Sequence, residues 1–177
     1  MSENLEDFND VSVYGIAPER RDVLLSRHDE CAVTWSTSDG WPVGVMHIYI
    51  WHNGHFWVSC MPERKRVAAL RARPRSSVIV AFEHEQTVTA KTLATVHEHG
   101  STHHDWFYHA LARKVLPTQP ASVQALGEDA WVERIDSPGR VVIEFTPQKW
   151  ISFDGRKVGA HAEGLWQPGD PWIEPDE

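Results

Sequence analysis

The stretch GWPVGVMHIYIWHNGHFWVSCMPERKRVAALRARPR, residues 40–75, carries the clearest signals of the fold. Two runs rich in β-branched and aromatic residues, 42–51 and 55–60, are separated by the turn sequence HNG. Such runs around an Asn-Gly turn are typical of a β-hairpin, because glycine readily takes the positive φ of a tight turn. Residues 63–72 are predicted to form a helix that ends before Pro74, since the residue before a proline disfavours helical geometry.

The sequence on either side of this segment adds strands that follow one another through short turns. We expect helices at 18–29, 103–115 and 121–134, and strands at 31–37, 76–84, 87–97, 140–147 and about 150–153. Alternate residues of the long strand, from Val88 to Val96, are small and suit a narrow barrel interior. The order lacks alternating βαβ units and Gly-rich phosphate-loop motifs, so the pattern favours an antiparallel α+β barrel.

Length and composition exclude several classes of protein. A chain of 177 residues with 41% hydrophobic residues suits one domain with its own core. The formal net charge of -8 makes nucleic acid an unexpected partner, and no apolar run is long enough to span a membrane. The first ten residues are acidic and resemble no secretory signal, so we expect a cytoplasmic protein. Cys31 and Cys60 lie far from CxxC spacing, which argues against disulfides and common zinc motifs.

Basic residues are concentrated in one segment of this acidic chain. Residues 64–75 contain six arginines and lysines and no acid. Guanidinium and ammonium groups on a helix that begins just after a strand can bind a phosphate, together with free backbone N–H groups. A solvated helix face is the alternative. The segment therefore predicts a site for a small anionic group.

The same segment has a recognisable order of elements. A strand ends in small polar residues, a short turn follows, and a basic residue stands four positions before an apolar anchor and eight before a Pro-Arg pair. These elements are Ser59-Cys60, Arg64-Lys65-Arg66, Leu70 and Pro74-Arg75. This order resembles the cofactor-binding segment of the pyridoxamine 5'-phosphate oxidase-like split-barrel family. Members include FMN enzymes and flavin or deazaflavin oxidoreductases, some of which use coenzyme F420. The resemblance extends over about 20–153.

The resemblance implies an α+β fold, an antiparallel split β-barrel with flanking helices, in a domain at 1–153 that precedes an acidic C-terminal tail at 154–177. It also implies a homodimer with FMN, or alternatively F420, at the interface, and hydride transfer to or from a small organic molecule. Either Lys65 or Arg66 is then the principal phosphate ligand, and no catalytic acid or base is assigned. The cofactor-binding residues implied are Met46, His47, Ile48, Tyr49, Ser59, Cys60, Lys65, Arg66, Thr87 and Trp150.

A group of histidines provides a competing signal. His97, His99, His103 and His104 precede Asp105, and imidazoles at this density could bind a metal or haem. Their spacing matches no defined metal motif, so we predict no metal site and interpret the region as the start of a helix with exposed histidines. The alternative function is a non-catalytic carrier or sensor that binds haem or flavin on the same barrel.

Overall fold

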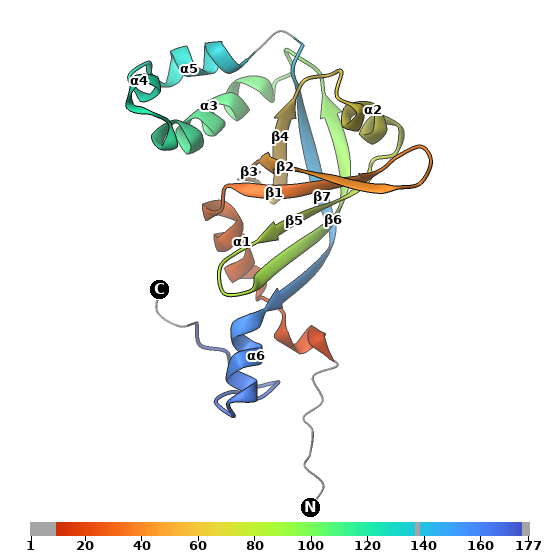
Figure 1. Cartoon of the computed structure of the whole chain (residues 1–177), viewed down its shortest axis with the longest axis vertical. Coiled ribbons are helices and arrows are strands. Elements are labelled where there is room, and N and C mark those ends of the chain that lie inside the picture. Colours follow the sequence, from red (N-terminus) through yellow and green to blue (C-terminus); the bar gives the residue numbers. More distant parts are fainter. Residues whose placement is uncertain (1–9, 137–138, 175–177) are drawn as a thin grey trace, which may run out of the picture.

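A computed structural model describes residues 10–136 and 139–174 (Figure 1). Its seven strands form one antiparallel sheet in the order β2-β1-β5-β6-β7-β4-β3. The strands are β1 (Glu30–Ser36), β2 (Pro42–Ile48), β3 (Ile50–His52), β4 (His55–Cys60), β5 (Arg75–Ala81), β6 (Gln86–His97) and β7 (Val141–Asp154). The predicted antiparallel split barrel in an α+β fold is confirmed.

The sheet curls into a half-barrel because its two edge strands are neighbours in the chain. β2 pairs with β1 at one edge, β3 pairs with β4 at the other, and only Tyr49 separates β2 from β3. The Tyr49 backbone N–H donates to the Asp29 carbonyl at 3.1 Å, and its hydroxyl donates to the Leu25 carbonyl at 2.8 Å. The single strand expected at 42–51 is therefore wrong: the chain changes pairing partner at a buried tyrosine.

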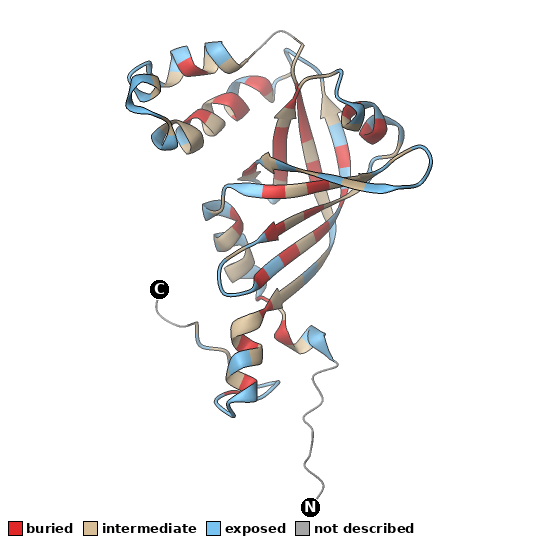
Figure 2. Ribbon diagram, in the orientation of Figure 1, coloured by how far each residue is buried: buried red, intermediate tan, exposed pale blue. Residues whose placement is uncertain are grey.

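The core fills the inside of the curled sheet, as the red segments of Figure 2 show. The small-residue face of β6 points inward: Val88 and Ala90 are fully buried, and Thr92 and Ala94 nearly so, which confirms the interior predicted for these positions. The two last predicted strands are in fact one, β7, whose pairing with β6 shifts register between Lys91 and Thr92. Such a bulge bends a strand without ending it.

The helices pack around this half-barrel. They are α1 (Pro18–Arg27), α2 (Lys65–Ala72), α3 (His104–Val115), α4 (Ala121–Gln124), α5 (Gly127–Ile135) and α6 (Gly155–Ala162), with 3-10 turns η1 (Val11–Tyr14) and η2 (Leu116–Thr118). The helix predicted at 121–134 is interrupted at Gly127, whose φ of 78° is incompatible with a continuous helix. Within the described part of the chain, no helix has the length and apolar character needed to cross a bilayer.

Helices α3 to α5 form a projection at one end of the sheet (Figure 1). Phe107 and Tyr108 of α3 are buried against Trp57 and Val142, which lie on the outer face of β4 and β7. At the opposite end of the sheet, α6 packs on η1 (Figure 1), and the Tyr14 hydroxyl is 2.7 Å from His161 Nδ1. The first part of the predicted tail is therefore an ordered helix.

Candidate functional site

The start of α2 brings cationic side chains to the end of β4. Cys60 is the last residue of β4, and α2 begins five residues later at Lys65. Lys65 is exposed, whereas Arg66 is half-buried and its Nε is buried without a hydrogen-bond partner. Among the described residues, the ion pairs with carboxylates involve none of Arg64, Lys65, Arg66 and Arg140. In an acidic protein, cations without acidic partners indicate a site for an external anion.

Arg66 lies beside two neutral groups. Burial lowers the pKa of His47 to about 4, and the charge of Arg66 contributes to the same shift. Burial also raises the pKa of the Cys60 thiol, although Arg66 and Arg140 pull that pKa down. Cys60 is 4% exposed, so it is a packed side chain rather than a nucleophile. Because its neighbours are neutral, the positive charge of Arg66 is uncompensated.

Ser59 and Cys60 face opposite sides of the sheet. Cys60 belongs to the core inside the half-barrel, whereas the Ser59 hydroxyl lies 2.7 Å from the Tyr108 hydroxyl of α3. Arg140 donates to the same Ser59 oxygen at 3.3 Å. Tyr108 and Arg140 were not anticipated, because the sequence does not show that α3 folds back over β4. The two residues of the strand end therefore cannot both direct their side chains at one phosphate.

The four consecutive residues predicted to contact the cofactor ring, Met46 to Tyr49, lie in three different environments. Met46 and Ile48 are 61% and 41% exposed on the outer face, while His47 points inward opposite Cys31. Tyr49 is fully buried, and Lys114 lies over its ring at 4.6 Å. The Tyr49 side chain is therefore a core element, and only Met46 and Ile48 offer an accessible apolar surface.

Thr87 and Trp150 lie far along the sheet from the start of α2. Pairing places Val142 beside both Ser59 and His97, whereas Thr87 is ten residues back along β6, or about 33 Å of strand. Trp150 packs against Trp51 at 6.0 Å between ring centroids, with the Arg21 guanidinium 4.0 Å from its ring. Within one protomer these two residues do not join the cationic group at α2.

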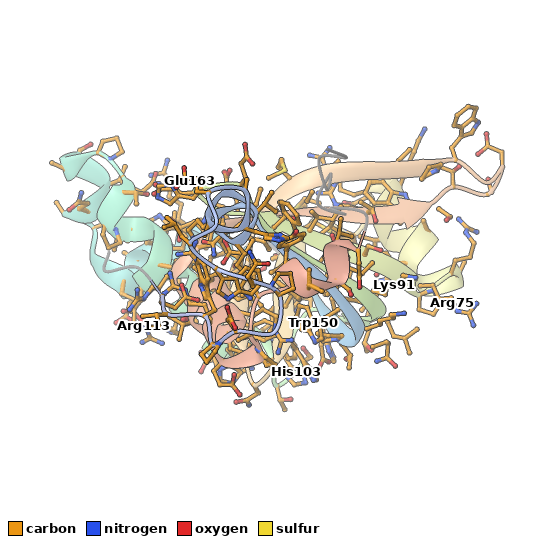
Figure 3. The ribbon with its side chains drawn as sticks, turned by 90° about the horizontal axis from the view of Figure 1, so that it is seen from below. Arg75, Lys91, His103, Arg113, Trp150 and Glu163 are labelled. Atoms are coloured by element: carbon orange, nitrogen blue, oxygen red, sulfur yellow. The ribbon has the colours of Figure 1, made fainter. Side chains whose placement is uncertain are left out.

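A separate groove follows the β6 bulge. Its volume is about 580 Å³, and Arg75 and Lys91 are its two cations (Figure 3). Pairing puts Arg75 opposite Leu93, so both cations lie on adjacent strands close to the register shift. The other lining residues are Thr34, Trp35, Ser36, Pro42, Ser76, Ser77, Thr92, Leu93 and Gln148. The groove can hold a group that carries negative charge.

The histidines of the predicted competing site divide into two groups. His97 Nε2 is 2.9 Å from Glu144, whose other oxygen contacts His55. Burial raises the pKa of Glu144, but these two hydrogen bonds outweigh burial and hold the pKa below its usual range. The His103 ring packs against Trp57 in a tilted arrangement, with ring centroids 5.0 Å apart. These side chains are engaged in structural contacts.

The second group consists of His99, His104 and Asp136. His104 is buried, so the expectation that all of these histidines are exposed is wrong for this residue. Burial lowers the pKa of His104 despite the opposing charge of Asp136. Asp105 is not part of the group: its carboxylate lies 3.8 Å from His109 on the next turn of α3.

The sequence matches no family model, and no curated protein matches it. Comparison of structures identifies the class: the chain has the split-barrel fold of pyridoxamine 5'-phosphate oxidase-like, FMN-binding proteins.

Three solved structures illustrate this similarity. The conserved hypothetical protein Rv2991 of Mycobacterium tuberculosis has a TM-score of 0.66 at 14% identity, covering 92% of this chain and 93% of its own. An F420 reductase has a TM-score of 0.54 at 17% identity, with coverages of 73% and 94%. HutZ, a heme storage protein of Vibrio cholerae, has a TM-score of 0.53 at 13% identity, with coverages of 79% and 97%. At these identities, the likeness establishes the fold.

The buried imidazole of His47 has a measurable effect on acid stability. Its pKa is about 4 in the folded chain and 6.5 when unfolded, so between these values the unfolded state binds a proton that the folded state does not. We expect the free energy of unfolding to fall by about 3 kcal/mol from this residue as the pH drops from 6.5 to 4. Denaturant titrations of the ligand-free protein and of His47→Gln should differ in slope over this range. Parallel pH profiles would show that His47 does not titrate in this way.

Proposed function

We propose that this protein binds a phosphate-bearing flavin, FMN or the deazaflavin F420, and transfers hydride between it and a small organic molecule. The proposal rests mainly on one observation, the group of cations at the start of α2 that has no carboxylate partner among the described residues. The split-barrel fold is the second support. When bound, the flavin ring supplies the hydride chemistry, and the protein supplies binding, orientation and shielding.

Arg66 is the principal phosphate ligand in this proposal. Its half-buried guanidinium is held beside the neutral His47 and Cys60, and an unpaired buried Nε favours an incoming acceptor. Lys65 and the free N–H groups of the first turn of α2 add positive charge at the same end. Arg140 is a further cation at the end of β4: it donates to Ser59, and its charge opposes the burial that raises the pKa of Cys60.

A homodimer completes the site in this proposal. Met46 and Ile48 lie exposed on the edge strand β2, and Trp41, 68% exposed, precedes it. Burial of such apolar side chains between two protomers is favourable at about 25 cal/mol per Å². Trp150 is remote from the start of α2 in its own protomer, so only the partner's copy could lie against a ring bound there.

The groove at the β6 bulge bears on the choice between FMN and F420. Arg71 is paired with Glu98 at 2.5 Å, and Arg73 donates to the Ser36 carbonyl, so these two arginines are engaged. Arg75 and Lys91 line the groove and are free of acidic partners among the described residues. A groove with two such cations, in addition to those at α2, favours a ligand with a longer anionic tail than that of FMN, and F420 is that candidate.

Haem storage or sensing is the second candidate function, because the heme storage protein HutZ has the same fold. The histidines give it less support: His97 is hydrogen-bonded to Glu144, and His103 packs against Trp57 and Trp106. An axial haem ligand needs an accessible imidazole nitrogen.

Separate titrations of the purified protein with FMN, F420 and haemin test the proposal. We expect FMN or F420 to bind with micromolar or tighter affinity, followed by reduction and substrate-dependent reoxidation of the bound ring. Arg75→Gln together with Lys91→Gln should weaken F420 binding and leave FMN binding unchanged. Binding of haemin alone, or binding without turnover with any reductant and acceptor pair, would favour a carrier over an enzyme.

A further inference from the structure

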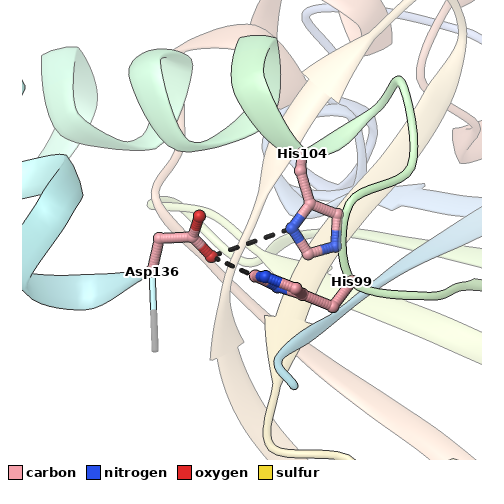
Figure 4. Close-up of side chains that lie close together, drawn as sticks. All are labelled: His99, His104 and Asp136. Atoms are coloured by element: carbon pink, nitrogen blue, oxygen red, sulfur yellow. Dashed lines mark ion pairs between the residues drawn. The ribbon is translucent and has the colours of Figure 1, made fainter. Parts of the chain in front are cut away.

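Three side chains with metal-binding atoms converge beside the projection formed by α3 to α5. His99 lies in the loop after β6, His104 begins α3, and Asp136 follows α5 (Figure 4). One ligand atom from each residue lies within 4.8 Å of the other two. Asp136 Oδ1 is 3.8 Å from His99 Nδ1 and 3.7 Å from His104 Nδ1.

Three polar atoms of this cluster, on His104 and Asp136, are buried without a hydrogen bond. The His104 side chain is 7% exposed, and neither of its ring nitrogens has a hydrogen-bond partner. Asp136 Oδ1 is also buried and without a hydrogen bond. Leaving a buried polar group unsatisfied costs about 1–3 kcal/mol, so such groups usually have a ligand, ion or water.

The spacing of the atoms is that of ligands around a shared centre rather than of a hydrogen-bonded group. Both imidazole-to-carboxylate distances exceed the hydrogen-bond range, and the carboxylate oxygen is nearly equidistant from the two nitrogens. Nitrogen and oxygen ligands at about 2.0–2.2 Å in a tetrahedral zinc site are separated by about 3.4 Å. A contraction of a few tenths of an ångström would bring each imidazole nitrogen to that separation from the carboxylate oxygen.

We propose that His99, His104 and Asp136 bind a divalent transition-metal ion of the zinc type, with solvent completing its coordination. Two imidazoles and one carboxylate form a donor set that suits zinc and its first-row neighbours better than magnesium or calcium, which prefer oxygen ligands. His99 is 44% exposed on its side chain, which leaves a route for the ion from solvent.

The bound ion stabilises the attachment of the projection formed by helices α3, α4 and α5 to the barrel. Its ligands come from the loop after β6, the start of α3 and the end of α5, and these elements are separated by up to 37 positions in the chain. The ion therefore crosslinks three segments. It does not involve Arg66 or Lys65, so this site and the flavin site can be tested separately.

The test uses the full-length chain without a histidine tag, stripped with EDTA and titrated with Co²⁺ and then with Zn²⁺. We expect one equivalent of Co²⁺ to give visible ligand-field bands that Zn²⁺ abolishes. A Zn²⁺ excess of about 100-fold over Kd should raise the melting temperature by about 5–10 °C. His99→Ala and Asp136→Asn should each weaken the affinity at least 10-fold.

His103→Ala is the matched control, since His103 adjoins His104 in the chain but packs against Trp57 outside the cluster. It should retain the Co²⁺ bands and the thermal shift. His99 is partly exposed, so its replacement tests the ligand set without disturbing a buried packing position. The proposal is overturned if the wild-type chain binds neither ion at one equivalent, or if His99→Ala and Asp136→Asn bind as tightly as His103→Ala does.

Discussion

Replacing Arg66 with glutamine will weaken FMN binding by roughly 10- to 150-fold, which corresponds to the loss of one charge-assisted hydrogen bond of about 1.5–3 kcal/mol. Arg66 is half-buried beside Cys60 and His47, and no described acid neutralises it. Lys65→Gln should cost less, because Lys65 is exposed and its charge is screened by solvent. Titration monitored by the quenching of flavin fluorescence measures each affinity. If F420 is the ligand, the same order of effects is expected for it.

Riboflavin provides the control for the phosphate. It has the same ring as FMN but no phosphate, so Arg66→Gln should leave its weaker binding unchanged. Arg71→Gln is the matched variant on the same helix, since Arg71 already pairs with Glu98 and should not contribute to either ligand. Equal losses for FMN and riboflavin in Arg66→Gln would mean that Arg66 acts on the ring or on the fold. Unchanged FMN affinity in the double variant of Lys65 and Arg66, with its fold and assembly intact, would refute the proposed site.

Replacing Phe56 with alanine will lower the free energy of unfolding by about 3–5 kcal/mol, the usual cost of truncating a buried phenylalanine. Phe56 is fully buried, and its ring lies 5.3 Å from Tyr49, 4.8 Å from Trp51 and 6.1 Å from Trp150 between centroids. These contacts hold together β4, β7 and the corner at which the chain leaves β2. The cavity left by the ring would lie at this corner, where Tyr49 joins the two edge strands β2 and β3.

Chemical denaturation measures this effect, and the melting temperature should fall by roughly 6–20 °C for a chain of this size. Leu165→Ala is the control: that side chain is 76% exposed, so its removal should change the unfolding free energy by less than about 0.5 kcal/mol. A loss below about 1 kcal/mol in Phe56→Ala would contradict the packing described for the corner.

The local pattern of the sequence predicted most secondary structure because hydrophobic alternation and turn residues act within a few positions. The helix predicted at 18–29 is α1, which ends two residues earlier, and that at 63–72 is α2, which begins two residues later. The break at Gly127 was missed because a glycine is compatible with a helical pattern until its φ is known. The corner at Tyr49 was missed because the alternation of the strand continues across it, while the pairing partner changes from β1 to β4.

The candidate site also combines features that the local sequence predicts with features that only the tertiary structure decides. The concentration of cations after β4 is visible in the sequence, since it depends only on residue type and spacing along one short segment. Ser59 and Cys60 face opposite sides because successive residues of a strand alternate, but which side is the core and which lies under α3 depends on the tertiary structure.

The sequence by itself determined most of the order of strands and helices and the presence of a cationic segment after β4, because propensity, periodicity and charge are properties of neighbouring residues. Only the tertiary structure decided that Tyr108 and Arg140 meet Ser59, and that Asp136 joins His99 and His104. These contacts join residues more than 30 positions apart. They form because α3 and α5 bury Phe107 and Tyr108 against the outer face of β4, and no local pattern specifies that docking.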